Sequence, residues 1–128
     1  MRALLDTHAI LWALADDARL GKNARSLVKN ATAGALAISD ISLLEIALLV
    51  HRGRVTLDGS LRALLEEVSA SFRVLPIEPA VAEKSKALQF EHADPFDRVI
   101  AATASHHRLT LVTQDKRFVK AREFETVW

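Results

Sequence analysis

Four acidic side chains combine a suggestive residue type with a suggestive position in the chain: Asp6, Glu45, Asp97 and Asp115. Two of them follow predicted strands, and the other two lie in the first turns of predicted helices. In a parallel α/β sheet the strand ends and the next helix starts share one edge, where ligands bind. Carboxylates that lie close together repel one another unless a divalent cation neutralises them. Hard oxygen donors favour Mg²⁺ or Mn²⁺ over zinc, and the matching chemistry is metal-assisted hydrolysis of phosphodiester bonds.

Each of these acids also has a structural interpretation. Asp6 precedes a predicted helix, and Asp is a preferred N-cap residue. Glu45 completes a Ser-x-x-Glu capping box that begins at Ser42. Asp115 stands between Gln and Lys after a strand, which is typical of a turn. The alternative function is therefore a non-catalytic α/β binding module whose acids only cap helices.

The segment DPFDR contains two further acidic positions to weigh, Asp94 and Asp97. Asp94 followed by Pro95 is typical of a helix start, with Asp as the N-cap and Pro in the first helical position. Asp97 then falls in the first turn, where an acid gains about 0.3–1 kcal/mol from the helix dipole. The residues after Arg98 are largely apolar, so Asp97 marks the point where a buried helix emerges. That position favours a functional site.

The elements that must position these acids alternate along the chain. Predicted strands span Arg2–Leu5, Leu36–Ser39, Val74–Ile77, Leu109–Thr113 and, at the end, Phe124–Trp128. Predicted helices span His8–Ala15, Asn23–Thr32, Ser42–His51, Leu61–Ser71, Ala80–Gln89 and Pro95–His107. This alternation predicts an α/β sandwich around a central, mainly parallel sheet of four or five strands.

Length and composition restrict the possible functions. The chain has 128 residues, of which half are hydrophobic, and its formal charge is +1 from 17 basic and 16 acidic residues. We expect one domain, residues 1–128. The absence of Cys and Tyr excludes thiolate and phenolic chemistry and Cys-ligated metals. Asp6, Thr7 and His8 interrupt the only signal-like apolar run, so we expect a cytoplasmic protein without a membrane segment.

Four segments of the sequence resemble the motifs of PIN-domain ribonucleases, and above all the VapC-type toxins of type II toxin–antitoxin systems. They are DTHAILW, ISLLEIA, DPFDR and LVTQDKRF. The resemblance implies a three-layer PIN-like sandwich and an endoribonuclease that depends on Mg²⁺ or Mn²⁺. It further implies an RNA substrate, a homodimer and a cognate antitoxin that neutralises the enzyme. Operator DNA would be contacted only indirectly, through the antitoxin.

The resemblance also implies roles for individual residues. The metal ligands and catalytic residues would be Asp6, Glu45, Asp97 and Asp115. Auxiliary positions would be Asp94, as a helper or only a helix cap, and the hydroxyl residues Thr7 and Thr113 beside the first and last acids. Arg98 is also auxiliary, either contacting phosphate or pairing with a neighbouring carboxylate. A basic stretch after the last acid would hold the RNA backbone or form a solvated face: Lys116, Arg117 and Lys120.

Overall fold

A five-stranded parallel sheet lies at the centre of the computed structural model, which describes residues 2–89 and 94–128. The strands are β1 (Ala3–Leu5), β2 (Leu36–Ser39), β3 (Arg73–Leu75), β4 (Thr110–Val112) and β5 (Thr126–Val127). Their order is β3-β2-β1-β4-β5, and each neighbouring pair is parallel. The predicted parallel sheet is therefore confirmed. Its central strand, β1, ends directly before Asp6.

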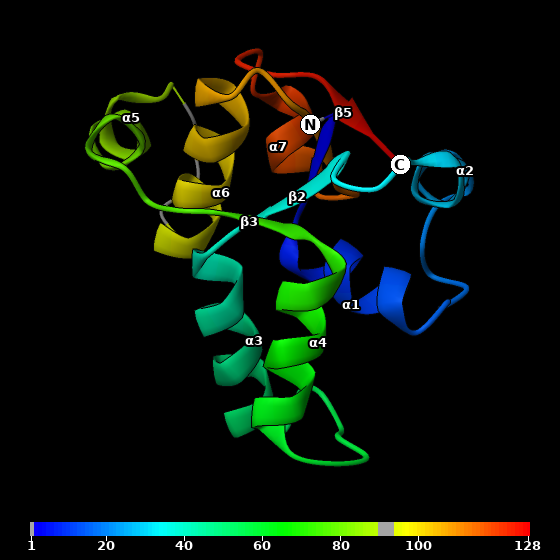
Figure 1. Cartoon of the computed structure of the whole chain (residues 1–128). Coiled ribbons are helices and arrows are strands. Elements are labelled where there is room, and N and C mark those ends of the chain that lie inside the picture. The colour runs from blue at the N-terminus through cyan, green and yellow to red at the C-terminus, as the bar shows by residue number, and fades with distance from the viewer. Residues whose placement is uncertain (1, 90–93) are drawn as a thin grey trace.

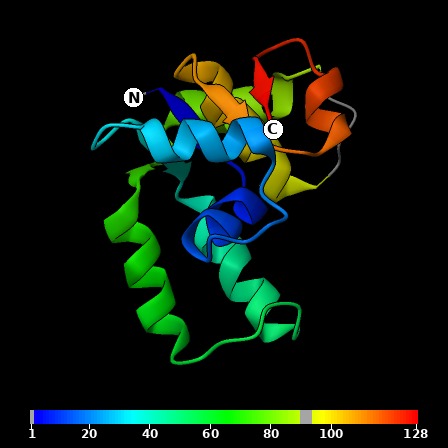
Figure 2. The same cartoon turned by 90° about the vertical axis from the view of Figure 1, so that its right-hand side faces the viewer.

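Helices cover both faces of this sheet (Figures 1 and 2). In the described part of the chain they are α1 (Thr7–Leu14), α2 (Lys22–Asn30), α3 (Ile41–His51), α4 (Leu61–Ser71), α5 (Pro79–Ala87), α6 (Pro95–His106) and α7 (Lys116–Lys120). The β1 side chains alternate between the faces. Leu4 packs into a core with residues of α5, α6 and α7, whereas Ala3 and Leu5 pack with residues of α1 to α4. The result is the expected three-layer sandwich.

The third strand ends earlier than the sequence predicts. The prediction ran to Ile77, but β3 stops at Leu75. Pro76 has no amide hydrogen for a sheet ladder. The Ile77 N–H donates to the Asp40 carboxylate at 3.2 Å, which turns the chain away from the sheet.

The start of α3 corrects the predicted capping box. The helix begins at Ile41 with Asp40 as its N-cap, so Ser42 lies inside the first turn and caps nothing. Ser42 is fully buried, and its hydroxyl oxygen lies within hydrogen-bond distance of the Thr7 hydroxyl oxygen, at 3.2 Å. The sequence analysis placed Glu45 in the first turn of this helix. Because α3 begins at Ile41, Glu45 lies in the second turn instead.

The paired helices α3 and α4 extend below the sheet in Figure 1 and are joined by a loop at their far end. Gly53, with a φ of 71°, lets the chain leave α3 in the left-handed region that glycine tolerates. Over residues 2–89 and 94–128, no helix combines the length and apolar character needed to cross a membrane.

Candidate active site

The first acid lies where β1 passes into α1. The Asp6 N–H donates to the Val112 carbonyl at 3.1 Å, which extends the pairing of β1 with β4. Its carboxylate accepts from the Ala9 N–H at 2.9 Å, so Asp6 is the N-cap of α1. The side chain is only 9% exposed. Burial raises the pKa of Asp6, against the lowering effect of hydrogen bonds from Thr113 and Ala9.

Glu45 reaches the same region from α3. Its carboxylate accepts a hydrogen bond from the Thr7 hydroxyl, which ties α3 to the first turn of α1. Burial raises the pKa of Glu45, the bond from Thr7 lowers it, and the charges of Asp94 and Asp6 raise it further. The predicted hydroxyl position Thr7 therefore orients Glu45 directly.

Asp97 lies in the first turn of α6, as predicted. Burial is the largest cause that raises its pKa, which reaches about 7. The remaining causes are the negative charges of four carboxylates: Asp94, Glu45, Asp115 and Asp6. The negative charge of every other predicted site acid therefore acts on Asp97. This indicates that the four candidate ligands and Asp94 lie at one edge of the sheet.

Asp94 and Asp115 both begin helices. The Asp94 carboxylate accepts from the Phe96 N–H at 2.8 Å and caps α6. The Asp115 carboxylate accepts from the Arg117 N–H at 2.9 Å and caps α7, a helix that the sequence analysis did not predict. The backbone of Asp115 is also fixed, because its N–H donates to the Thr113 hydroxyl oxygen at 3.1 Å. Thr113 thus contacts both the first and the last acid.

Arg98 makes two backbone contacts that the sequence analysis did not predict, while its two predicted roles, phosphate contact and carboxylate pairing, stay predictions. Its guanidinium donates to the Ser85 carbonyl at 2.6 Å and to the Leu88 carbonyl at 2.9 Å. Ser85 belongs to α5, and Leu88 follows that helix directly. These contacts join the end of α5 to the start of α6, and they fix the helix that presents Asp97.

Comparison with known proteins decides the family. A family model described as PIN domain matches residues 3–123, a range that includes all four acids. The chain belongs to the PIN-domain family. Ribonuclease VapC22 of Mycobacterium tuberculosis is 35% identical to this PIN domain over 128 residues, which cover 98% of this chain and 97% of that protein. The resemblance found in the four sequence motifs is thereby confirmed.

Solved structures agree with the fold of this PIN domain. A toxin–antitoxin complex from Klebsiella pneumoniae matches with a TM-score of 0.69 and 27% identity, covering 98% of this chain and 96% of that chain. A DNA-bound VapBC from Salmonella typhimurium matches with a TM-score of 0.74 and 20% identity, covering 99% and 97%. At that lower identity the second match supports the fold alone.

The acids of this PIN domain offer the right donors for Mg²⁺ or Mn²⁺, since all are carboxylate oxygens. Among the described residues, however, no group of three or more His, Asp or Glu side chains is already arranged to hold an ion. Two of the four carboxylates are held by other side chains: Thr7 binds Glu45, and Arg117 binds Asp115. The donor set fits a divalent cation, and the side chains would have to move to close around it.

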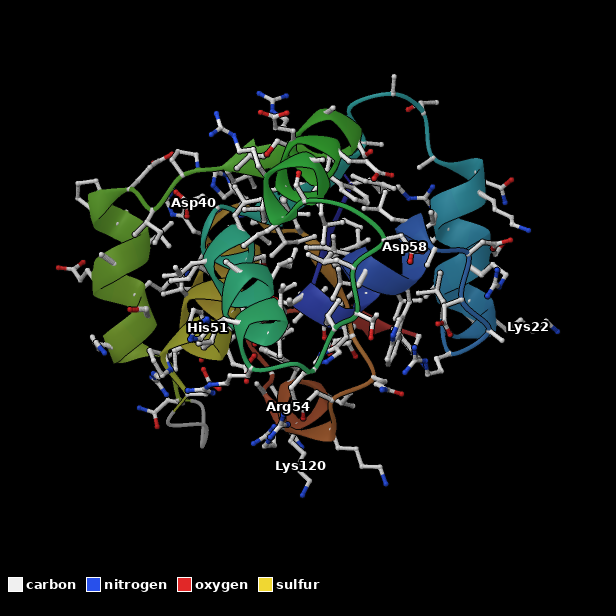
Figure 3. The ribbon with its side chains drawn as sticks, turned by 90° about the horizontal axis from the view of Figure 1, so that it is seen from below. Lys22, Asp40, His51, Arg54, Asp58 and Lys120 are labelled. Atoms are coloured by element: carbon white, nitrogen blue, oxygen red, sulfur yellow. The ribbon has the colours of Figure 1, made fainter. Side chains whose placement is uncertain are left out.

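A hollow of about 870 Å³ lies between α1, the α3–α4 loop and α4, and none of the site acids lines it. His8 and Trp12 of α1 line one wall, and the loop around Asp58 lines another. Figure 3 shows the loop with Asp58 passing over α1 when the molecule is seen from below. The sequence analysis did not identify this hollow, because it depends on how far α3 and α4 extend.

Proposed function

We propose that this chain is a Mg²⁺- or Mn²⁺-dependent endoribonuclease that acts in the cytoplasm as the toxin of a type II toxin–antitoxin module. The observation that carries the proposal is geometric: Asp6 and Asp115 follow the neighbouring parallel strands β1 and β4, Thr113 contacts both, and Asp97 lies within range of their charges. A PIN domain that is 35% identical to a ribonuclease supports RNA as the substrate. A site of this kind is unfavourable in a protein that has no cation to bind.

Four carboxylates would hold the cation: Asp6, Glu45, Asp97 and Asp115. When bound, the cation supplies an activated water and stabilises negative charge at the scissile phosphate. The contribution of the chain is to fix the ligands. Thr7 orients Glu45, Thr113 orients both Asp6 and Asp115, and the caps on α1 and α7 restrict two of the carboxylates.

The basic residues of α7 would hold the RNA backbone beside the acids. Lys116, Arg117 and Lys120 are all exposed, and the helix that bears them begins at Asp115. Figure 3 shows Lys120 extending away from the body of the protein. Cationic side chains at this place would contact phosphates without selecting a base sequence.

The antitoxin would occupy the hollow beside α1. Its walls combine apolar residues such as Trp12 with His8, whose charge lowers the pKa of both Asp6 and Glu45. A segment bound there would reach the acids only through His8, the lining residue that follows Asp6 by two positions. The similar structures from Klebsiella and Salmonella are a toxin–antitoxin complex and a DNA-bound VapBC. Contact with operator DNA would occur only through the antitoxin.

A second copy of the chain would cover the exposed apolar surface near the start of α3. Leu44 is 60% exposed and Ile77 is 41% exposed, which is unusual for large aliphatic residues in a small domain. The bond between the Ile77 N–H and Asp40, one turn before Leu44, places both residues at the same end of α3. This patch favours a homodimer.

The binding-module alternative has one observation in its favour, since Asp6, Asp94 and Asp115 do cap helices. Glu45, however, caps no helix, because the N-cap of α3 is Asp40. Capping therefore does not account for all four acids.

The test is cleavage of a mixed RNA substrate by the purified protein. We expect cleavage with Mg²⁺ or Mn²⁺, none with EDTA, and none with Asp6→Asn. Expression of the wild type without an antitoxin should arrest growth, and Asp6→Asn should not. Asp58→Asn, which changes an exposed acid outside the cluster, is the control for expression and folding. Metal-independent cleavage, or equal cleavage by Asp6→Asn, would refute the proposal.

A further inference from the structure

Arg117 forms a bidentate ion pair with Asp115, the last acid of the site. Its Nε lies 3.1 Å from one carboxylate oxygen of Asp115, and its terminal nitrogen lies 2.9 Å from the other. Both oxygens of a candidate metal ligand are thus engaged by a cation that belongs to the protein. The Asp115 side chain is 26% exposed and that of Arg117 is 58% exposed. The pair lies where water, a metal ion or RNA can reach it.

The guanidinium is not what fixes Asp115 in place. The carboxylate also accepts from the backbone N–H of Arg117, and the Asp115 N–H is bound to Thr113. Both contacts involve backbone atoms that would remain without the Arg side chain. The guanidinium can therefore leave while Asp115 keeps its position at the start of α7.

A second pair in the same protein shows that an Asp and the Arg two residues after it can form this bidentate ion pair away from the site acids. Asp17 and Arg19 have the same spacing and form the same fork, with distances of 3.0 and 2.8 Å, at the far end of α1 from Asp6. Exposed ion pairs of this kind contribute little to stability and exchange readily with solvent. The fork at Asp115 differs in its surroundings, because Arg117 also lies within range of the negative charges of Asp97 and Asp94.

We propose that Arg117 is an exchangeable counter-ion of the site: it neutralises Asp115 when no divalent cation is bound, releases that carboxylate to the cation, and then offers its guanidinium to an RNA phosphate. This inference rests on the proposed function, since it assumes that Asp115 is a metal ligand. It assigns Arg117 a charge-compensating and phosphate-binding role and separates it from the other basic residues of α7. One residue would then couple loading of the metal to binding of the RNA backbone.

The experiment is a titration of the full-length, antitoxin-free protein with Mn²⁺. Binding is measured by isothermal titration calorimetry or by the electron paramagnetic resonance signal of free Mn²⁺. The Arg117→Ala variant should bind Mn²⁺ roughly three- to ten-fold more tightly than the wild type. The reason is that it lacks both a nearby positive charge and the group that competes with Mn²⁺ for Asp115. Arg19→Ala breaks the twin fork away from the acids and should bind Mn²⁺ like the wild type. Arg117→Gln, which keeps polar hydrogens without the charge, provides a second variant if the Ala variant does not fold.

RNA binding supplies the second readout. Arg117→Ala should raise the KM for RNA and lower the slope of log affinity against log salt by about one. If the wild type binds Mn²⁺ and Arg117→Ala binds it equally or more weakly, the counter-ion role is wrong and the proposed function still stands. If the wild type binds no Mn²⁺ and cleaves no RNA, the proposed function fails and this inference fails with it.

Discussion

Replacing Asp97 by Asn should make the metal-free protein more stable at neutral and alkaline pH. The pKa of Asp97 rises from an ordinary 3.8 to about 7 in the folded protein. The folded state therefore holds a proton that the unfolded state has already lost between those two values. By linkage, the free energy of unfolding falls as pH increases from about 4 to about 7, and it is constant above that range for this group.

The size of the effect follows from the same two values. A difference of about three in pKa corresponds to about 4 kcal/mol, at about 1.4 kcal/mol for each pKa unit. Asp97 is only half-buried, so solvent screening reduces this figure. The Asn variant also loses about 0.3–1 kcal/mol of interaction with the dipole of α6. We expect Asp97→Asn to raise the free energy of unfolding at pH 8 by about 1–3 kcal/mol after these corrections.

The assay is urea denaturation in EDTA at pH 4, 6 and 8. The gain in the Asn variant should be near zero at pH 4, intermediate at pH 6 and full at pH 8. Asp58→Asn, at an exposed position in the α3–α4 loop, should track the wild type at every pH. A variant that is less stable than the wild type at pH 8, or a gain of equal size at pH 4 and pH 8, would refute the explanation by crowded, buried charge.

Two further predictions concern the residues that hold the site and the chain end. Thr7→Val removes the hydroxyl bound to Glu45, so the free energy of unfolding should fall by about 1–3 kcal/mol. Thr7→Ser keeps a hydroxyl and should stay near the wild type. Equal free energies for the two variants in urea denaturation would contradict this prediction. A Cβ on Gly21 would lie 2.5 Å from the Trp128 backbone, so Gly21→Ala should cost about 1–3 kcal/mol and alter the near-ultraviolet circular dichroism. Gly59→Ala, where nothing lies within 4 Å of the new Cβ, should change stability by less than about 0.5 kcal/mol.

The sequence predicts the sheet edge well because its signals are local. Alternating apolar strands and helices place Asp6 after β1 and Asp97 in the first turn of α6, and the structure agrees with both positions. Asp94 followed by Pro95 also marks the helix start correctly. These features depend on residues within a few positions of one another, so pattern and propensity suffice.

The features that the sequence misses depend on contacts between distant segments. Ser42 matches a capping box, but Asp40 starts the helix two residues earlier, and the Ser42 side chain contacts the Thr7 hydroxyl instead of a backbone N–H. The helix α7 has a single buried anchor, Phe118, which is too little for a periodic pattern. The contacts of Arg98 with carbonyls at the end of α5 join distant residues, so no local motif could reveal them.

The most direct test of the shared carboxylate site is the stoichiometry and affinity of Mn²⁺ binding in a matched set of variants. The set comprises Asp6→Asn, Glu45→Gln, Asp97→Asn and Asp115→Asn, with Asp58→Asn as the control outside the cluster. We expect the wild type and the control to bind Mn²⁺ alike, and each of the four variants to bind it at least about ten-fold more weakly, since each loses a charged ligand. Binding of wild-type strength in any one of the four variants would show that this residue does not share the site.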